Sequence, residues 1–297
     1  MRGVRQRAFT LLELMVVLTV LGIVTAGLGR ILVTSERLSQ ASAQRIGLRQ
    51  GLRAAASVLP AEFRELDAAD SDIIAMSATS ITLRATRQLG FLCSVSGGGG
   101  ASGLSLIIRQ APMYGERQSF DVGDSVLLYV EGDPGTRSDD AWVPGFVSGT
   151  WTDACPDPDR PRAGERLTVH LAGMADTSLA TGRGITTGSP LRGFTVVTYA
   201  AYQSPSDHQW YLGQQVGAAA IQPLVGPLDG PTAFALEYAD SAGLPTRVPT
   251  AVAEIEVRVR GRTTAPVYTA GGAVAYQLDS VVAQAALRNN PRCHGCP

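Results

Sequence analysis

The pattern of hydrophobic and polar positions divides the chain into three parts. Residues 9–29, FTLLELMVVLTVLGIVTAGLG, are almost entirely apolar and carry a single charge, at Glu13. Residues 30–59 contain no proline, and their apolar side chains recur at spacings of three, four and seven, which places them on one face of a helix. These positions are Leu38, Ala41, Leu48, Leu52, Ala55 and Leu59. Beyond residue 72, short alternating runs broken by Gly, Pro and Asp predict β-strands.

The apolar run has the length of a membrane span. At about 1.5 Å per residue, a helix over residues 9–29 is roughly 30 Å long, which matches the hydrocarbon thickness of a bilayer. A leader over residues 1–8 carries three arginines and no acid, which predicts a cytoplasmic N-terminus. We therefore expect four parts: the leader, a transmembrane helix over 9–29, its amphipathic continuation over 30–59, and a head over 60–297. We also expect Pro60 to end or kink the helix.

The sequence of the head predicts a β-rich unit, so the whole chain is expected to be an α+β protein. The predicted strands are residues 80–86, 104–109, 125–130, 166–171, 194–202, 210–215, 232–238 and 253–261. Few helical segments lie between them, so the sheet is expected to be antiparallel, with one face packed on the long helix. Residues 94–103 are expected to form a flexible loop and 132–164 a long irregular region. Residues 281–289 fit a helix and a strand equally well.

A cleaved secretory signal peptide is the competing interpretation of the N-terminus. Ala26 and Gly27 resemble a small-residue cleavage site. Glu13 speaks against it, because a carboxylate inside the apolar run costs about 2.5–3.5 kcal/mol on insertion scales. Such an acid is by default a functional residue that has a partner.

The string RAFTLLELMVVLTVLGI resembles the N-terminal motif of type IV prepilins and of type II secretion pseudopilins. The resemblance implies that prepilin peptidase cuts between Ala8 and Phe9 and methylates the Phe9 amine. Glu13 then occupies the fifth mature position, where the family carries its assembly glutamate. Ala8 departs from the pattern, since glycine is usual before the cut, and slower processing is expected. The implied partners are the peptidase, other minor and major pilins or pseudopilins, and inner-membrane lipid.

The motif also implies a location: a single-pass inner-membrane protein with a cytoplasmic N-terminus and a periplasmic head, later incorporated into a pilus or pseudopilus. The order of elements over residues 222–245, 253–261 and 277–290 resembles the C-terminal half of PilW-like minor pilins. That resemblance implies a minor pilin that initiates or caps pilus assembly. Two alternatives stay open, a J-type minor pseudopilin of a type II secretion system and a filament-tip adhesin or binding module.

Four cysteines lie in the part expected outside the cytoplasm, where disulfides persist. Three pairings are possible, and we favour Cys93–Cys155 and Cys293–Cys296. The tail sequence RCHGCP also contains a CxxC motif with an internal histidine, which is found in thiol oxidoreductases and in zinc sites. Its position at the end of the chain and the single CxxC make both less favoured than a disulfide.

Charged residues make up 17% of the chain, and the net charge is -1. All 25 basic residues are arginines. The absence of lysine excludes Walker A, Schiff-base and Ser-Lys chemistry. Near neutrality gives no reason to expect nucleic-acid binding. An arginine row, Arg45, Arg49 and Arg53, runs along the helix and is followed by acids expected to neutralise it within the chain or between subunits. These acids are Glu62, Glu65, Asp67, Asp70 and Asp72.

No catalytic string accompanies His170 or His208, so the chain is expected not to be an enzyme and to hold no cofactor or metal. The acidic loop residues do not follow EF-hand spacing and are interpreted as solvated turns. A secreted enzyme behind an ordinary signal peptide remains the third hypothesis. It predicts a mature N-terminus near Ala26 instead of at Phe9.

Overall fold

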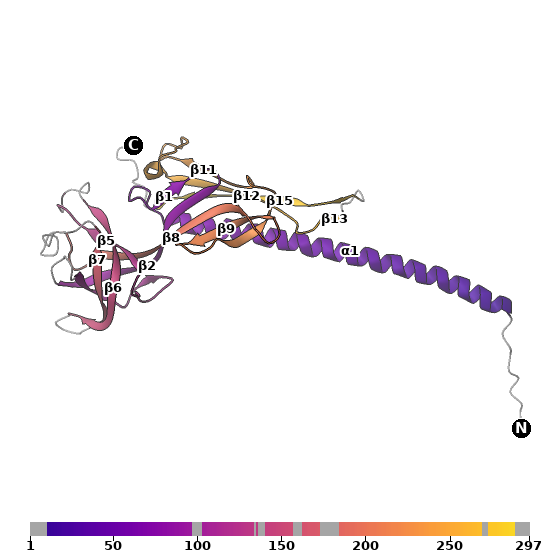
Figure 1. Cartoon of the computed structure of the whole chain (residues 1–297), viewed down its shortest axis with the longest axis horizontal. Coiled ribbons are helices and arrows are strands. Elements are labelled where there is room, and N and C mark those ends of the chain that lie inside the picture. Colours follow the sequence, from indigo (N-terminus) through magenta and orange to yellow (C-terminus); the bar gives the residue numbers. More distant parts are fainter. Residues whose placement is uncertain are drawn as a thin grey trace, which may run out of the picture.

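A long helix carries a β-rich head at its C-terminal end (Figure 1). The computed structural model describes residues 11–96, 103–133, 135, 140–156, 162–172, 184–268 and 273–288. The elements are α1 (Leu11–Arg64), β1 (Ile73–Met76), β2 (Ser80–Ser96), β3 (Leu104–Arg109), β4 (Tyr114–Gly115), β5 (Ser125–Val130), β6 (Ala141–Cys155), β7 (Arg162–Leu171), β8 (Pro190–Gln203), β9 (Trp210–Val216), β10 (Gln222–Leu228), β11 (Phe234–Ala239), the 3₁₀ turn η3 (Pro249–Ala251), β12 (Glu254–Arg262), β13 (Val267–Tyr268), β14 (Val274–Ala275) and β15 (Leu278–Ala286). The predicted α+β class is confirmed.

Helix α1 is unbroken over 54 residues and continues past Pro60 to Arg64. Pro60 therefore does not end the helix. Residues after Pro60 are held by packing, since Pro60 and Phe63 are both buried in the head. Tertiary burial outweighs the one backbone hydrogen bond that a proline removes.

Thirteen of the strands in the described residues form one antiparallel sheet, in which β2 and β8 pair over most of their lengths, and β13 and β14 form a separate pair. The ladder from β2 runs through β3, β7, β6, β5 and β8 and returns to β2. These six strands thus close into a barrel, which removes their free edges. The barrel lies at the end of the molecule opposite to the helix N-terminus (Figure 1).

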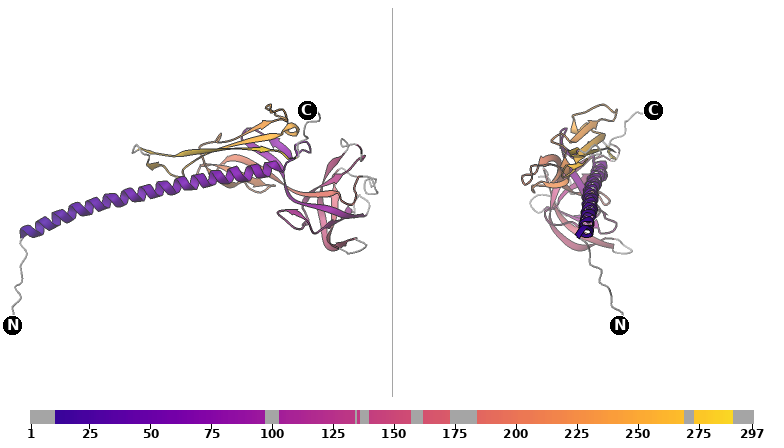
Figure 2. Two further views of the ribbon diagram at one scale, coloured as in Figure 1. Left: turned by 180° about the vertical axis from the view of Figure 1, so that it is seen from behind. Right: turned by 90° about the vertical axis from the view of Figure 1, so that its right-hand side faces the viewer.

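Strands β9, β10, β11, β12 and β15 continue the sheet as an open part that packs on the second half of α1, as the sequence predicted (Figure 2). Strands β10, β12 and β15 contact the helix directly. The helix and this open sheet enclose a first apolar core, in which Leu52, Ala55 and Leu59 of the helix are buried together with side chains of the sheet. A second core fills the barrel. Its members include Leu92, Leu106, Ile108, Val126, Leu128, Val147, Leu167, Val169 and Leu191. The head therefore holds two separate apolar cores.

One predicted position of the helix stripe lies outside the first core. Leu38 is 65% exposed, whereas Ala41, Leu52, Ala55 and Leu59 are buried and Leu48 packs against the core. The helical period was predicted correctly, but the sheet covers the helix only from about Ala41 onward.

All eight predicted strands are present, one further expectation is corrected and one open alternative is decided. Most of the described part of 132–164 is not irregular, because β6 runs through it and pairs with β5 on one side and β7 on the other. Residues 278–286, for which the sequence left helix and strand open, form a strand, because β15 pairs with β12 along its whole length. In both cases cross-strand pairing decides the conformation, and local propensity does not. The expected loop 94–103 begins as the end of β2, and residues 97–102 lie outside the described part of the chain.

Candidate functional site

Nothing in the described part of the chain covers the first half of α1. From Leu11 to Val33, its apolar side chains are exposed on all sides of the helix. Within the described residues, α1 is the one helix that is long and apolar enough to cross a membrane. A helix that is apolar around its whole circumference needs lipid or other apolar helices as its surroundings.

The polar groups of this segment are satisfied locally. The hydroxyls of Thr19, Thr25 and Thr34 donate hydrogen bonds of 2.7–2.9 Å to backbone carbonyls three or four residues earlier. In lipid, where water is absent, such bonds remove the cost of an unpaired hydroxyl. These threonines are therefore compatible with a membrane-spanning segment.

Three glycines in the same segment do not interrupt the helix. A Cβ at Gly22, Gly27 or Gly29 would meet no atom of the described residues within 4 Å. Packing against this part of the chain therefore does not require glycine at these positions. Small residues on a membrane helix are the positions where another helix can approach closely.

Glu13 lies in the first turn of α1 with its side chain exposed. Ala8 and Phe9 lie outside the described residues, so the cleavage and methylation assigned to them stay predictions. The negative charge of Glu13 at a helix N-terminus is favoured by the helix dipole. Apart from Arg30, it is the one charge between Leu11 and Val33.

The arginine row is engaged by the strand that runs beside it. The guanidinium of Arg45 donates to Gln277 Oε1, and that of Arg49 lies 3.3 Å from Asp279 Oδ2. Two of the acids expected to neutralise this row have other partners. Glu62, in the last turn of α1, binds Arg87 at 2.9 Å, and Asp72 binds Arg192. For these two acids the intrachain expectation was wrong, because their partners lie on β2 and β8, whereas neutralisation between subunits stays a prediction.

Asp72 and Arg192 form a buried ion pair at the junction of the helix, the open sheet and the barrel. Their side chains are 0% and 7% exposed. The second carboxylate oxygen of Asp72 accepts a hydrogen bond of 2.9 Å from the backbone N–H of Asp67, just after α1. The guanidinium of Arg192 also lies 5.2 Å from the centre of the Trp142 ring, on barrel strand β6. One pair thus joins the helix end to the barrel.

The same junction contains carboxyl groups with raised pKa values. Burial is the main cause at Asp72, where the Arg192 guanidinium opposes the rise in pKa. Burial and repulsion by the Asp67 carboxylate raise the pKa of Asp70 to about 6. The loop is therefore sensitive to pH between about 4 and 6.

Comparison with known families identifies the N-terminal segment. Residues 4–29 match the family model of the prokaryotic N-terminal methylation motif. This chain carries that motif. The match confirms the resemblance to type IV prepilins and pseudopilins that the FTLLE string predicted. No curated protein and no solved structure matches the chain.

The head contains a disulfide that the sequence predicted. Cys93 on β2 and Cys155 at the end of β6 are joined, with their Cα atoms 5.5 Å apart. The bond ties two strands of the barrel and closes a separation of 62 residues. The other predicted pair, Cys293 and Cys296, lies outside the described residues, as does His294.

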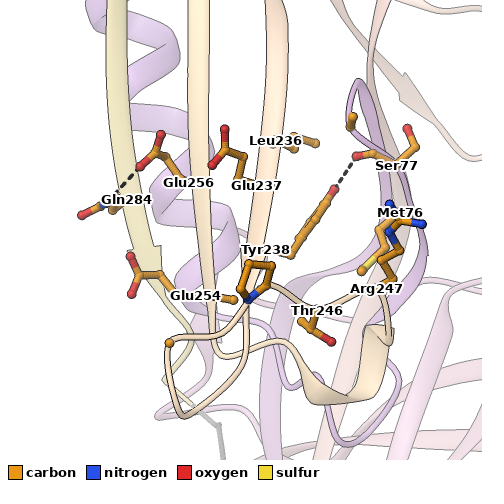
Figure 3. Close-up of a pocket in the computed structure, with 14 residues that line it drawn as sticks. Met76, Ser77, Leu236, Glu237, Tyr238, Thr246, Arg247, Glu254, Glu256 and Gln284 are labelled. Atoms are coloured by element: carbon orange, nitrogen blue, oxygen red, sulfur yellow. Dashed lines mark hydrogen bonds between the residues drawn. The ribbon is translucent and has the colours of Figure 1, made fainter.

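A pocket of about 620 Å³ lies between β11 and the turn from β1 to β2 (Figure 3). Tyr238 crosses it and donates a hydrogen bond of 3.0 Å to the carbonyl of Ser77. Glu237, Glu254 and Glu256 make one side of it acidic, on the sheet face opposite to the helix. Its lining contains neither histidine nor cysteine. Among the described residues no cluster of His, Cys, Asp or Glu fits a metal ion.

Proposed function

We propose that this chain is a minor type IV pilin of the PilW-like kind, which initiates or caps filament assembly and has a structural role, not a catalytic one. Prepilin peptidase would cut between Ala8 and Phe9 and methylate the new Phe9 amine. The observation that carries the proposal is the methylation motif over residues 4–29, continuous with an uncovered apolar helix. The chain would be anchored in the inner membrane, with its head in the periplasm, before assembly.

Charge complementarity gives Glu13 its proposed role. After cleavage, the cationic amine of Phe9 lies four residues, or about 6 Å along the helix, from the Glu13 carboxylate. In a low dielectric, an amine and a carboxylate of neighbouring subunits attract strongly, and neither is stable there alone. Such a pair would set the axial register between this chain and the next subunit.

The fold supports this role because the head is fixed to the helix. The side chains of Leu52, Ala55, Leu59 and Phe63 are buried against the sheet. The register of the helix in a filament would therefore determine the position of the whole head. This is what a subunit that starts or ends a filament requires.

The first test is the mature N-terminus. Mass spectrometry of the protein purified from membranes should find N-methylated Phe9. A mature chain that starts near Ala26 would contradict the proposal and favour an ordinary signal peptide.

The second test replaces the assembly glutamate. Glu13→Ala should leave membrane insertion intact and abolish co-purification with partner pilins. Glu36→Ala is the matched control, since Glu36 is an exposed acid on the same helix beyond the apolar run. Normal co-purification of Glu13→Ala, or equal loss in both variants, would contradict the role of Glu13. The identity of the co-purifying proteins also separates a pilus from a J-type pseudopilus of a secretion system.

A surface on the barrel favours a second candidate function, binding at the filament tip. The Trp151 ring is 55% exposed and lies over Gly149, where a Cβ would overlap it. Beside it, Asp153 pairs with Arg166, and these residues line a shallow pocket of about 550 Å³ with Ser105 and Thr168. A flat aromatic face next to hydroxyl and charged groups suits an amphipathic sugar ring.

This second function is tested by a glycan array probed with the full chain. Trp151→Ala should remove a bound glycan signal, whereas Tyr114→Ala, at another exposed barrel aromatic, should retain it. An array without any bound glycan would contradict the sugar-binding function.

A further inference from the structure

A hairpin arm extends from the open sheet along the helix toward its N-terminal end (Figure 2). The arm consists of residues 263–268 and 273–278 and contains β13 and β14. These strands pair Val267 with Ala275 and Tyr268 with Val274, and they form a sheet of their own. The arm is thus separate from the large sheet and reaches farther toward the apolar end of α1.

Three contacts fix the arm to the helix. The backbone N–H of Ala265 donates to Gln44 Oε1 at 3.1 Å, and Arg45 donates to Gln277. Farther along, the Arg37 guanidinium lies 4.6 Å from the centre of the Tyr268 ring. Because the helix is regular, this last contact places Tyr268 at the level of Arg37.

That level is close to the end of the apolar segment. The exposed apolar side chains continue to Ile31, Leu32 and Val33, so the stretch from Leu11 to Val33 is about 33 Å long. Arg37 follows Val33 by four residues, or about 6 Å. The polar headgroup layer on each side of a bilayer is about 5–7 Å thick. With the membrane span of α1 extended to Val33, four residues past the end of the segment 9–29 predicted from the sequence, Tyr268 therefore lies within the headgroup layer.

The surface of the arm has the composition of a membrane interface. Tyr268, Val274 and Tyr276 are 43–55% exposed, although all three are large and apolar or aromatic. The Arg262 guanidinium lies 4.6 Å from the Tyr276 ring, in the same arrangement as Arg37 and Tyr268. Tyrosine is enriched at the level of lipid headgroups, and arginine pairs with lipid phosphates. Exposed apolar patches of this kind mark interaction sites.

We propose that the arm docks into the headgroup layer of the bilayer that α1 spans, with Tyr268 as its anchor. The occupant of this surface is lipid, because the patch continues directly from the membrane segment and is bordered by guanidinium groups. The arm would fix the tilt and rotation of the helix, and so the orientation of the head, before assembly. This inference rests on the proposed membrane anchoring.

The test places a tryptophan on the arm of the full chain, reconstituted in vesicles of phosphatidylcholine with phosphatidylglycerol. In the Tyr268→Trp variant, lipids brominated near the headgroup should quench the added emission about two-fold more than in the Tyr114→Trp control. Tyr114 is an exposed tyrosine on β4, in the barrel part of the head. Val274→Trp, at the exposed position paired with Tyr268, gives a second measurement if Tyr268→Trp does not fold.

The outcomes separate this proposal from the proposed function. Chains that do not float with the vesicles would overturn membrane anchoring, and the docking of the arm with it. Chains that float, but whose arm tryptophan is quenched no more than the control, would overturn the docking alone. Quenching that decreases as the protein-to-lipid ratio rises would show that another copy of the chain covers the arm, and would overturn lipid as its occupant.

Discussion

Removing the buried carboxylate of Asp72 is expected to destabilise the head strongly. In the Asp72→Ala variant, the Arg192 guanidinium would remain 7% exposed without its anionic partner. Arg192 Nε already finds no acceptor among the described residues. The ion pair with Asp72 is therefore the main interaction that offsets the desolvation cost of the buried guanidinium. The backbone N–H of Asp67 would lose its acceptor as well.

The expected cost is about 3–5 kcal/mol, the usual effect of leaving one buried charge unpaired. For a unit of 150–250 residues, each kcal/mol lowers the melting temperature by about 2–4 °C, so the expected decrease is roughly 10 °C. The double variant Asp72→Leu with Arg192→Met replaces the pair with apolar groups. It should retain only the cost of the unpaired Asp67 N–H, about 1–3 kcal/mol.

The measurement is thermal unfolding of the full chain in detergent micelles, followed by circular dichroism. Asp279→Ala is the control, because its pair with Arg49 is 41% and 68% exposed and is expected to contribute at most about 1 kcal/mol. Two results would refute the reasoning. One is a melting temperature of Asp72→Ala equal to that of the control, and the other is a double variant no more stable than the single one.

Three further predictions concern pH, packing and the disulfide. Because the pKa of Asp70 is raised to about 6 in the folded state, the folded chain binds a proton more readily than the unfolded chain. Stability should therefore increase as pH falls from about 6 to 4, by about 1 kcal/mol after solvent screening. In urea titrations, Asp70→Asn should reduce this dependence, and Asp72, whose pKa is also raised, should account for part of what remains. Gly261→Val should lower the free energy of unfolding by about 1–3 kcal/mol, because a Cβ at position 261 would lie 2.6 Å from Leu48 Cδ1. Adding Leu48→Ala to the same chain should restore part of the urea midpoint. Cys93→Ser should lower the free energy of unfolding by about 4 kcal/mol through loss of the crosslink to Cys155. Reductant should bring the urea midpoint of the wild type to that of the variant. A wild-type midpoint that reductant does not change would contradict this prediction.

Local signals were sufficient for much of the fold. The helical period over residues 30–59 and the alternation in eight short runs correctly predicted α1 and eight of the strands. The same signals failed for β6, whose run contains glycine and proline, and left β15 undecided, because its alanine-rich sequence fits a helix equally well. Each of these becomes a strand because its backbone groups find partners on neighbouring strands.

The functional features of the chain also include some that the sequence predicts and some that only the folded structure shows. The methylation motif and the apolar run are contiguous in the chain, so the sequence alone predicts the membrane segment and places Glu13 within it. The pair of Asp72 and Arg192 joins residues 120 positions apart, and no local pattern indicates it.

What the sequence determined by itself is therefore the nature of the N-terminal helix, because lipid acts on a contiguous run of side chains. What only the tertiary structure decided is the closure of the barrel and the position of the arm beside Arg37. Both depend on contacts between distant residues, and only the folded chain brings those residues together.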